Sequence, residues 1–148
     1  MNQYIESQLI RDEGERLKVY DDANGKPVVK GYTMQGHPTV GVGRNLAGLG
    51  ITREEARNLL FGDITRVESE LKRELPFYQE LDEPRQSVLL NMCFNLGIYR
   101  LLQFKNTLAA IEAGDYSKAA SGMRASLWAR QVGARADRLA HIMETGQA

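Results

Sequence analysis

Two stretches of sequence decide the fold: Asp12-Glu13-Gly14-Glu15-Arg16-Leu17-Lys18-Val19-Tyr20-Asp21-Asp22 and, after a turn-rich segment, Thr39-Val40-Gly41-Val42-Gly43. Apolar residues at near-helical spacing lead up to the first stretch, and Gly14 supplies a stop, so we predict a helix over residues 3–13. The β-prone pieces 17–20, 26–30 and 39–42 then predict a small antiparallel sheet, with Asn24-Gly25 as a hairpin turn.

The remainder of the chain predicts helices with recognisable ends. Thr52 and Glu55 form a capping box ahead of an apolar stripe, which indicates one long helix reaching toward Leu75. Asp82 caps a helix that stops near Gly97. Further helices are predicted over residues 101–113, 115–124 and 134–145. A helix, then a small sheet, then more helices is an α+β arrangement with segregated parts.

The composition is that of a globular chain with balanced charge. Of 148 residues, 43% are hydrophobic and 26% are charged, which argues against disorder. The 19 basic and 19 acidic residues cancel, so we expect no nucleic-acid partner. We also expect no stable membrane insertion, because no run approaches roughly 18 consecutive apolar residues. Glu6, Arg11 and Asp12 interrupt any signal-peptide core, which predicts cytoplasmic synthesis without a signal peptide.

Neither a metal nor a cofactor is expected. Cys93 is the only cysteine and stands in an apolar run, which is typical of a small core residue rather than a nucleophile. His37 and His141 lack the spacing of metal ligands. A calcium loop beginning at Asp22 fails because Lys26 occupies its fifth position. The Gly-x-Gly of residues 41–43 lacks the βαβ context of a dinucleotide site.

Glu13 and Asp22 are the residues that could carry chemistry. Glycoside hydrolysis needs two carboxyl groups, one protonated to feed the leaving oxygen and one ionised to activate water or attack carbon. Spacing alone leaves a second interpretation open, in which the pair is a surface charge and a turn aspartate. Gly41 and Gly43 leave part of the following strand without side chains, which suits close approach by a backbone or a ligand.

These residues resemble the active-site segment of the phage-type lysozymes, the muramidases of glycoside hydrolase family 24. Eight residues separate Glu13 from Asp22, which agrees with that family's spacing, and Thr39 opens the Val-Gly-Val-Gly stretch. The resemblance continues in the same order through residues 51–56, residues 91–97, and Trp128 with residues 133–146. It therefore covers nearly the whole chain.

The resemblance implies one lysozyme domain over residues 1–148. A small antiparallel sheet lobe (residues 14–50) would be joined by a long helix (51–75) to a mostly helical lobe (1–13 and 76–148), with a cleft between the lobes. Glu13 would match the general acid, Asp22 the carboxylate that activates water, and Thr39 the hydroxyl that helps to hold this water. The family also implies inversion, which requires carboxyl groups roughly 6.5–9.5 Å apart.

The same register places four substrate-binding candidates in the helical lobe: Phe94, Asn95, Thr107 and Trp128. For Phe94 and Trp128, ordinary core packing is the alternative interpretation. The implied substrate is bacterial peptidoglycan, cut at the β-1,4 bond between N-acetylmuramic acid and N-acetylglucosamine. We expect a monomer that acts on the cell wall for host cell lysis and is released by a separate pore-forming protein. A non-catalytic peptidoglycan-binding module and a lytic transglycosylase are the rival functions, and Asp22 argues against the transglycosylase.

Two departures from the family pattern stand out. Sixteen residues lie between Asp22 and Thr39, far more than the family pattern has. We predict that the excess, residues 26–38, lengthens the hairpin into a flap over one end of the cleft; a solvent-exposed elaboration is the alternative. Thr39 is preferred to Thr33 because only Thr39 leads into the Gly-Val-Gly strand. The second departure is Arg44, for which the register predicts an ion pair with Asp63.

Overall fold

The computed structural model describes residues 4–148, and this part of the chain holds eight α-helices, one 3-10 helix and a three-stranded antiparallel sheet. The predicted α+β class is confirmed. The chain divides into two compact units, Met1–Arg57 and Asn58–Ala148. Helix α2 (Arg53–Glu74) begins in the first unit and continues in the second. The assignment of residues 14–50, 51–75, and 1–13 with 76–148 to lobes of one domain stays a prediction.

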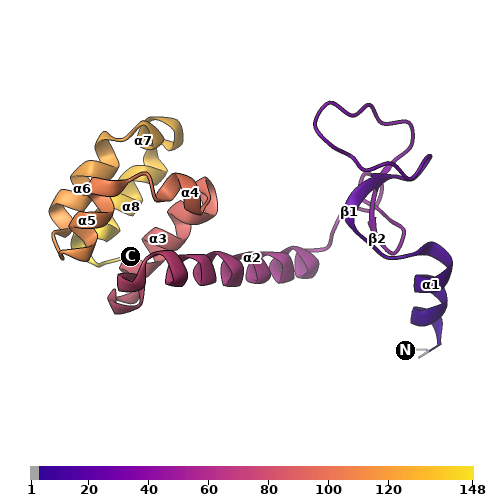
Figure 1. Cartoon of the computed structure of the whole chain (residues 1–148), viewed down its shortest axis with the longest axis horizontal. Helices are drawn as coiled ribbons and strands as arrows, with labels where there is room; N and C mark the ends of the chain where they lie inside the picture. The colour runs from indigo at the N-terminus through magenta and orange to yellow at the C-terminus, as the bar shows by residue number, and fades with distance from the viewer. Residues whose placement is uncertain (1–3) are drawn as a thin grey trace. The chain divides into compact units, whose positions relative to one another are not determined.

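The first unit contains helix α1 (Ile5–Glu13) and the sheet, whose strands are β1 (Arg16–Asp21), β2 (Pro38–Gly41) and β3 (Arg44–Asn45) in that spatial order. Figure 1 shows α1 leading directly into β1. Gly14 ends the helix as predicted, with a φ of 76° and its N–H bonded to the Ile10 carbonyl at 2.9 Å. Residue 3 of the predicted helix lies outside the described residues. In the sheet, Thr39 lies opposite Tyr20 on one side and Asn45 on the other.

Two details of the predicted sheet are wrong. Residues 26–30 form no strand, and their link to β1 is one isolated bridge between Tyr20 and Pro27. Backbone bonds flank this bridge, with the Asp21 N–H donating to the Lys26 carbonyl at 2.9 Å and the Val28 N–H to the Val19 carbonyl at 3.1 Å, but they extend into no strand. The lengthened hairpin expected for residues 26–38 is therefore absent. The Val-Gly-Val-Gly stretch is also not one strand, because Gly41 (φ 67°) and Gly43 (φ 70°) turn the chain from β2 into β3.

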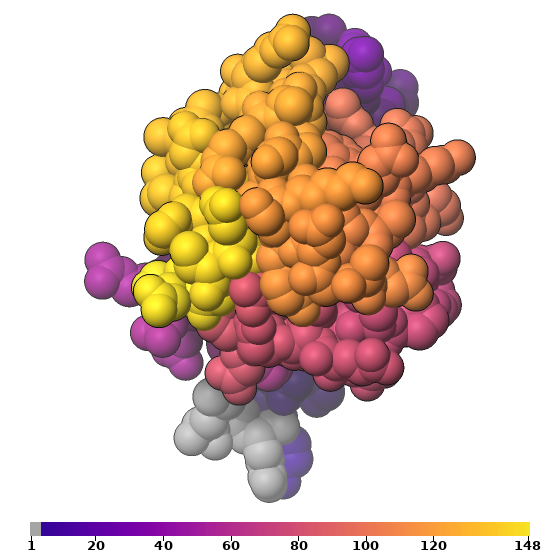
Figure 2. Space-filling model, turned by 90° about the vertical axis from the view of Figure 1, so that its left-hand side faces the viewer, coloured from indigo at the N-terminus to yellow at the C-terminus, as the bar shows by residue number. Residues whose placement is uncertain are grey.

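The second unit is helical. Its elements after α2 are η1 (Pro76–Glu80), α3 (Glu83–Leu96), α4 (Ile98–Leu101), α5 (Lys105–Glu112), α6 (Tyr116–Ala125), α7 (Leu127–Val132) and α8 (Ala134–Thr145). Helix α6 packs against α5 and α8, and α8 also packs against α3 and α7. Figure 2 shows one face of this unit, on which the yellow α8 lies beside the orange α6.

The predicted helix starts are confirmed in detail. The Thr52 hydroxyl accepts from the Glu55 N–H at 3.1 Å, and the Glu55 carboxylate accepts from the Thr52 N–H at 2.7 Å, so the capping box is closed in both directions. Asp82 accepts from the Arg85 N–H at 2.9 Å and caps α3. Helix α8 ends at Gly146, which is left-handed as a C-terminal glycine should be.

The helix predicted over residues 101–113 is wrong as a single element. The chain instead forms the short α4, a break at residues 102–104, and α5. At the break, the Phe104 ring meets the Trp128 ring edge-on, with centroids 6.4 Å apart, so tertiary packing overrides local helix propensity. Elements β3, η1 and α7 were not predicted, and α4 shares only Leu101 with the predicted helix. The N-cap of α7 is Ser126, whose hydroxyl accepts from the Ala129 N–H at 3.1 Å.

A single apolar core fills the second unit. Its fully buried members include Leu71 on α2, Leu89 on α3, Met123 on α6 and Met143 on α8. Cys93 lies in this core, as predicted, and burial raises the pKa of its thiol to about 11. Among residues 4–148, no helix is both long and apolar enough to cross a membrane.

Candidate active site

Glu13 is placed by the end of α1 and by the glycine turn of the sheet. It is the last residue of the helix, and its carboxylate lies against Gly43, where an added Cβ would come within 3.4 Å of Glu13 Oε2. The sequence predicted that Gly41 and Gly43 allow another group to approach closely. At Gly43, that group is the carboxylate of Glu13, the predicted acid. A side chain at residue 43 would narrow the space in front of this carboxylate.

Asp22 follows the last residue of β1 and is held at both carboxylate oxygens. Its Oδ1 accepts from the backbone N–H of His37 at 2.6 Å, and its Oδ2 lies 3.4 Å from His37 Nδ1. The Asp22 side chain remains 40% exposed, which leaves room for a water molecule or a substrate to reach it. His37 was predicted only as a surface residue without metal spacing, and its contact with Asp22 was missed.

Thr39 lies next to this pair but buries its side chain. It is 3% exposed, and its Oγ1 donates to the His37 carbonyl at 3.1 Å. The same carbonyl accepts from the Asp22 N–H at 3.1 Å. His37 therefore joins Asp22 and Thr39 through one peptide group, so the first unit brings together two of the residues that sequence analysis selected.

The four binding candidates lie in the second unit, in two different surroundings. Phe94 is 47% exposed and lines an apolar pocket of about 260 Å³, together with Leu60 and Ile64. Trp128 is 3% exposed and lines a more polar pocket of about 320 Å³. Its indole Nε1–H donates to Asn95 Oδ1 at 2.9 Å, so the side chains of these two candidates are hydrogen-bonded to each other.

Thr107 is the fourth candidate and is 7% exposed on α5. It lies under Gly122 of α6, where an added Cβ would come within 2.6 Å of the Thr107 Oγ1. Gly122 thus allows α5 and α6 to approach closely. The structure places Thr107 at a helix contact, and its role in binding stays a prediction.

The ion pair predicted for Arg44 is wrong in its partner. Arg44 Nη2 binds Glu55 Oε1 at 2.7 Å, and its Nη1 donates to the Gly50 carbonyl at 3.1 Å. Asp63 instead pairs with Arg66 within α2. The error arose because Glu55 was assigned only to the capping box, whereas its carboxylate serves both the Thr52 N–H and Arg44. The Thr52 N–H, more than the Arg44 charge, lowers the pKa of Glu55.

Asp21 is a residue of this region that sequence analysis missed. Its side chain is fully buried, and both of its oxygens accept hydrogen bonds from the segment that leads to His37. No group of three or more His, Cys, Asp or Glu side chains suited to a metal ion occurs within residues 4–148. Glu13 and Asp22 each carry a carboxyl group, a group that can transfer a proton.

A helix-end glutamate followed by a small antiparallel sheet, in a chain that also has a larger helical unit, defines the class: this is a glycoside hydrolase with a lysozyme-like α+β fold. The Phage lysozyme family model matches residues 11–141, and the chain therefore belongs to the phage lysozyme family.

Three relatives illustrate the range of this similarity. The pre-baseplate central spike protein of Enterobacteria phage T4 is 35% identical over 98% of this chain, but this chain spans only 28% of that protein's length. Probable T4-type lysozyme 1 of Dictyostelium discoideum is 28% identical, over 96% of this chain and 94% of that protein. The endolysin of Salmonella phage P22 is 32% identical, over 72% of this chain and 75% of that protein.

Proposed function

We propose that the protein hydrolyses the β-1,4 bond between N-acetylmuramic acid and N-acetylglucosamine in bacterial peptidoglycan, with inversion at the anomeric carbon. The observation that carries the proposal is the pair of carboxylates in the first unit. Glu13 ends α1 against the bare backbone of Gly43, and Asp22 follows β1 with its Oδ1 held by the His37 N–H. A pair of this kind is what glycoside hydrolysis requires.

In this reaction, Glu13 donates its proton to the leaving glycosidic oxygen. Asp22 accepts a proton from a water molecule that attacks the anomeric carbon from the opposite face. Because the Thr39 hydroxyl already donates to the His37 carbonyl, its oxygen lone pairs are left to accept a hydrogen bond from this water. The products are a new reducing end and a free hydroxyl at the former bridging oxygen.

The pocket around Trp128 supports binding of a sugar chain by the second unit. Trp128 and Phe104 line it together with the polar side chains of Gln103, Ser126 and Gln131. Aromatic rings with a few placed polar groups suit a ligand that has apolar faces and hydroxyl edges. We propose that Trp128 and Asn95 shape this surface together, because the indole N–H fixes the Asn95 amide. Phe94 and Thr107 complete the proposed set of binding residues.

The test is lysis of outer-membrane-permeabilised Gram-negative cells by the wild type beside Glu13→Gln. Loss of a proton donor should lower the rate about a thousandfold or more, which corresponds to roughly 4 kcal/mol of barrier. Glu15→Gln is the matched control, because it makes the same change at an exposed position two residues away. Equal loss in both variants would point to a general effect of the substitution and not to acid catalysis.

The products decide between the enzymatic alternatives. Mass spectrometry of digested peptidoglycan should show a reducing end, whereas a lytic transglycosylase would leave an anhydro sugar lighter by one water molecule. If the wild type binds purified peptidoglycan but clears no cells, the protein is a binding module. We further propose that the protein is a monomer that acts on the cell wall during host lysis, after a separate pore-forming protein opens the membrane.

A further inference from the structure

The carboxylate of Asp21 is buried directly beside the proposed water-activating residue. Asp21 has no exposed surface, and its Oδ2 accepts from the Gln35 N–H at 2.7 Å and from the Tyr32 hydroxyl at 3.0 Å. Its Oδ1 accepts from the Gly36 N–H at 2.9 Å and from the Ala23 N–H at 3.0 Å. Ala23 lies just after β1, and the other three donors lie within residues 26–38, the segment that the family pattern lacks.

These contacts make Asp21 the centre around which the extra segment folds. Backbone donors, led by the Gln35 N–H, hold the pKa of Asp21 below its ordinary value, so the carboxylate is ionised at neutral pH. A second layer supports the first, because the Asn24 side-chain amide donates to the Tyr32 hydroxyl at 2.8 Å. The segment is therefore not a free loop, although Pro38 is its only residue in a strand of the sheet.

The C-terminal end of the same segment lies against Asp22. His37 N–H donates to Asp22 Oδ1, and the residue before it, Gly36, has no space for a side chain. A Cβ at residue 36 would overlap the Asp22 carboxylate and come within 2.8 Å of the Ala23 backbone nitrogen. Gly36 thus bonds the buried Asp21 through its N–H, at a position where any side chain would overlap the exposed Asp22.

We propose that Asp21 is a positioning residue: its buried carboxylate holds Gly36 and His37 against Asp22 and thereby fixes the orientation of the Asp22 carboxylate toward the attacking water. This inference rests on the proposed function, in which Asp22 activates water. It gives the extra segment a task other than contact with the substrate. Reactions of this kind are sensitive to placement, since a shift of about 1 Å can cost a factor of roughly 100 in rate.

Two variants disturb the positioning from different sides. Asp21→Asn replaces one acceptor oxygen with an N–H₂ group that faces backbone N–H donors, so the hydrogen bonds to the backbone of residues 35 and 36 are disrupted. Gly36→Ala leaves Asp21 unchanged and pushes directly on Asp22. Tyr32→Phe removes only one of the bonds to Asp21 and should have a smaller effect. Val29→Ala, at a 63% exposed position in the same segment, is the matched control.

The measurement is kcat and KM on soluble, uncrosslinked glycan strands, with folding checked by far-UV circular dichroism. We expect kcat to fall about 10- to 100-fold in Gly36→Ala and at least about 10-fold in Asp21→Asn, with KM within about twofold of the wild type. A purely structural role of Asp21 would lower the folded fraction but leave kcat per folded molecule unchanged. If Asp21→Asn does not fold, Gly36→Ala and Tyr32→Phe carry the test.

Asp22→Asn separates the failure of this inference from that of the proposed function. If Asp22→Asn is inactive but Gly36→Ala and Asp21→Asn keep kcat within twofold of the wild type, Asp22 activates water and the positioning role is refuted. If Asp22→Asn is as active as the wild type, the assignment of Asp22 is wrong, and the inference fails with it. A fall in kcat that is largest in Gly36→Ala, smaller in Asp21→Asn and smallest in Tyr32→Phe, with kcat unchanged in Val29→Ala, supports the positioning role of Asp21.

Discussion

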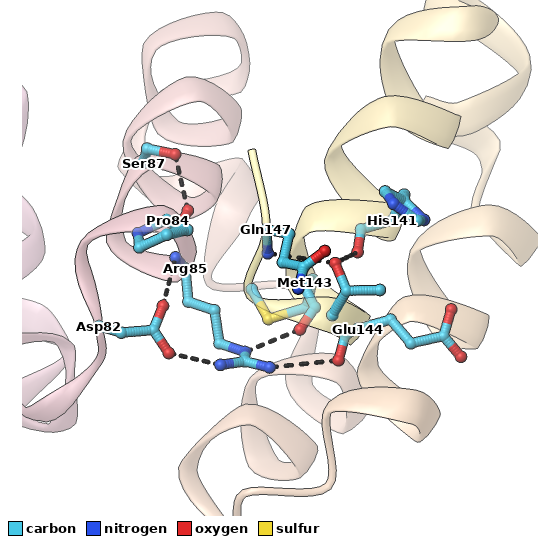
Figure 3. A network of polar contacts seen from close by, with 9 residues as sticks. Asp82, Pro84, Arg85, Ser87, His141, Met143, Glu144 and Gln147 are labelled. Carbon is cyan, nitrogen blue, oxygen red and sulfur yellow. Dashed lines mark hydrogen bonds and ion pairs between the residues drawn. The ribbon is translucent and has the colours of Figure 1, made fainter.

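Arg85 joins the start of α3 to the end of α8, and its removal should weaken the second unit more than any surface ion pair does. Figure 3 shows its guanidinium between the two helices. Its Nε donates to the Met143 carbonyl at 2.8 Å, its Nη2 donates to the Glu144 carbonyl at 3.1 Å, and its Nη1 binds Asp82. The guanidinium carbon also lies 3.7 Å from the centre of the Tyr116 ring.

The expected cost of Arg85→Met follows from these contacts. The bond to the Met143 carbonyl is partly buried and charge-assisted, so its loss costs about 1.5–2 kcal/mol. The more exposed bonds to Glu144 and Asp82 add about 0.5 kcal/mol each, because water replaces them. Loss of the cation over the Tyr116 ring adds about 0.5 kcal/mol. The sum is about 3 kcal/mol, equivalent to a fall of about 6–12 °C in Tm.

The assay is urea unfolding followed by the fluorescence of Trp128. This is the only tryptophan in the chain and is buried in the second unit, so it reports on the unit that Arg85 stabilises. Arg124→Met is the matched control: Arg124 also contacts Glu144, but at 3.3 Å and with both side chains 39% exposed, and should contribute about 1 kcal/mol at most. A loss in Arg85→Met no larger than that in Arg124→Met would refute the reasoning.

Three further predictions concern burial and charge. Backbone donors lower the pKa of Asp21, so its contribution to the free energy of unfolding is present above about pH 4 and is lost as pH falls through the lowered pKa. Urea unfolding followed by circular dichroism should therefore show that stability falls less between pH 5 and pH 3 in Asp21→Asn than in the wild type. Cys93 should resist a thiol-labelling reagent at pH 8 until the protein unfolds, and rapid labelling of the native protein would contradict its burial. Leu71→Ala should cost about 3 kcal/mol in the urea assay, whereas Leu59→Ala, at a 59% exposed position, should cost less than about 1 kcal/mol.

The structural features that the sequence predicts well in this chain depend on residues that are close together in the sequence. The Thr52 and Glu55 capping box, the Asp82 cap and the Gly146 stop each depend on contacts within a few positions, and each was predicted. The errors lie where distant residues decide. Helix α4 ends early where Phe104 meets Trp128, twenty-four positions away, and no local pattern indicates that contact.

In the candidate site, too, the residues that a motif marks were predicted, and the residue that depends on distant contacts was not. A motif spacing selected Glu13, Asp22 and Thr39, because the resemblance to the phage-type lysozymes runs through those positions. Asp21 could not be selected, since its donors lie up to fifteen positions away. An Asp-Asp pair in the sequence does not tell which of the two is buried. The doublet at the end of a β-prone run was the available signal, because one Asp ends the strand and the other begins the turn.

The opposite burial of Asp21 and Asp22 explains why two adjacent carboxylates can serve different purposes. Asp21 turns inward, where its two oxygens accept four hydrogen bonds, and a carboxylate with so many partners has little capacity left for a water molecule. Asp22 turns outward, where it accepts one backbone bond and stays within reach of solvent. The end of β1 at Asp21 therefore leaves one carboxylate in the scaffold and the other outside the strand, where it is available for chemistry. Because a shift by one position would exchange these environments, the register between β1 and β2, fixed by the pairing of Tyr20 with Thr39, is as necessary to the proposed site as the carboxylates themselves.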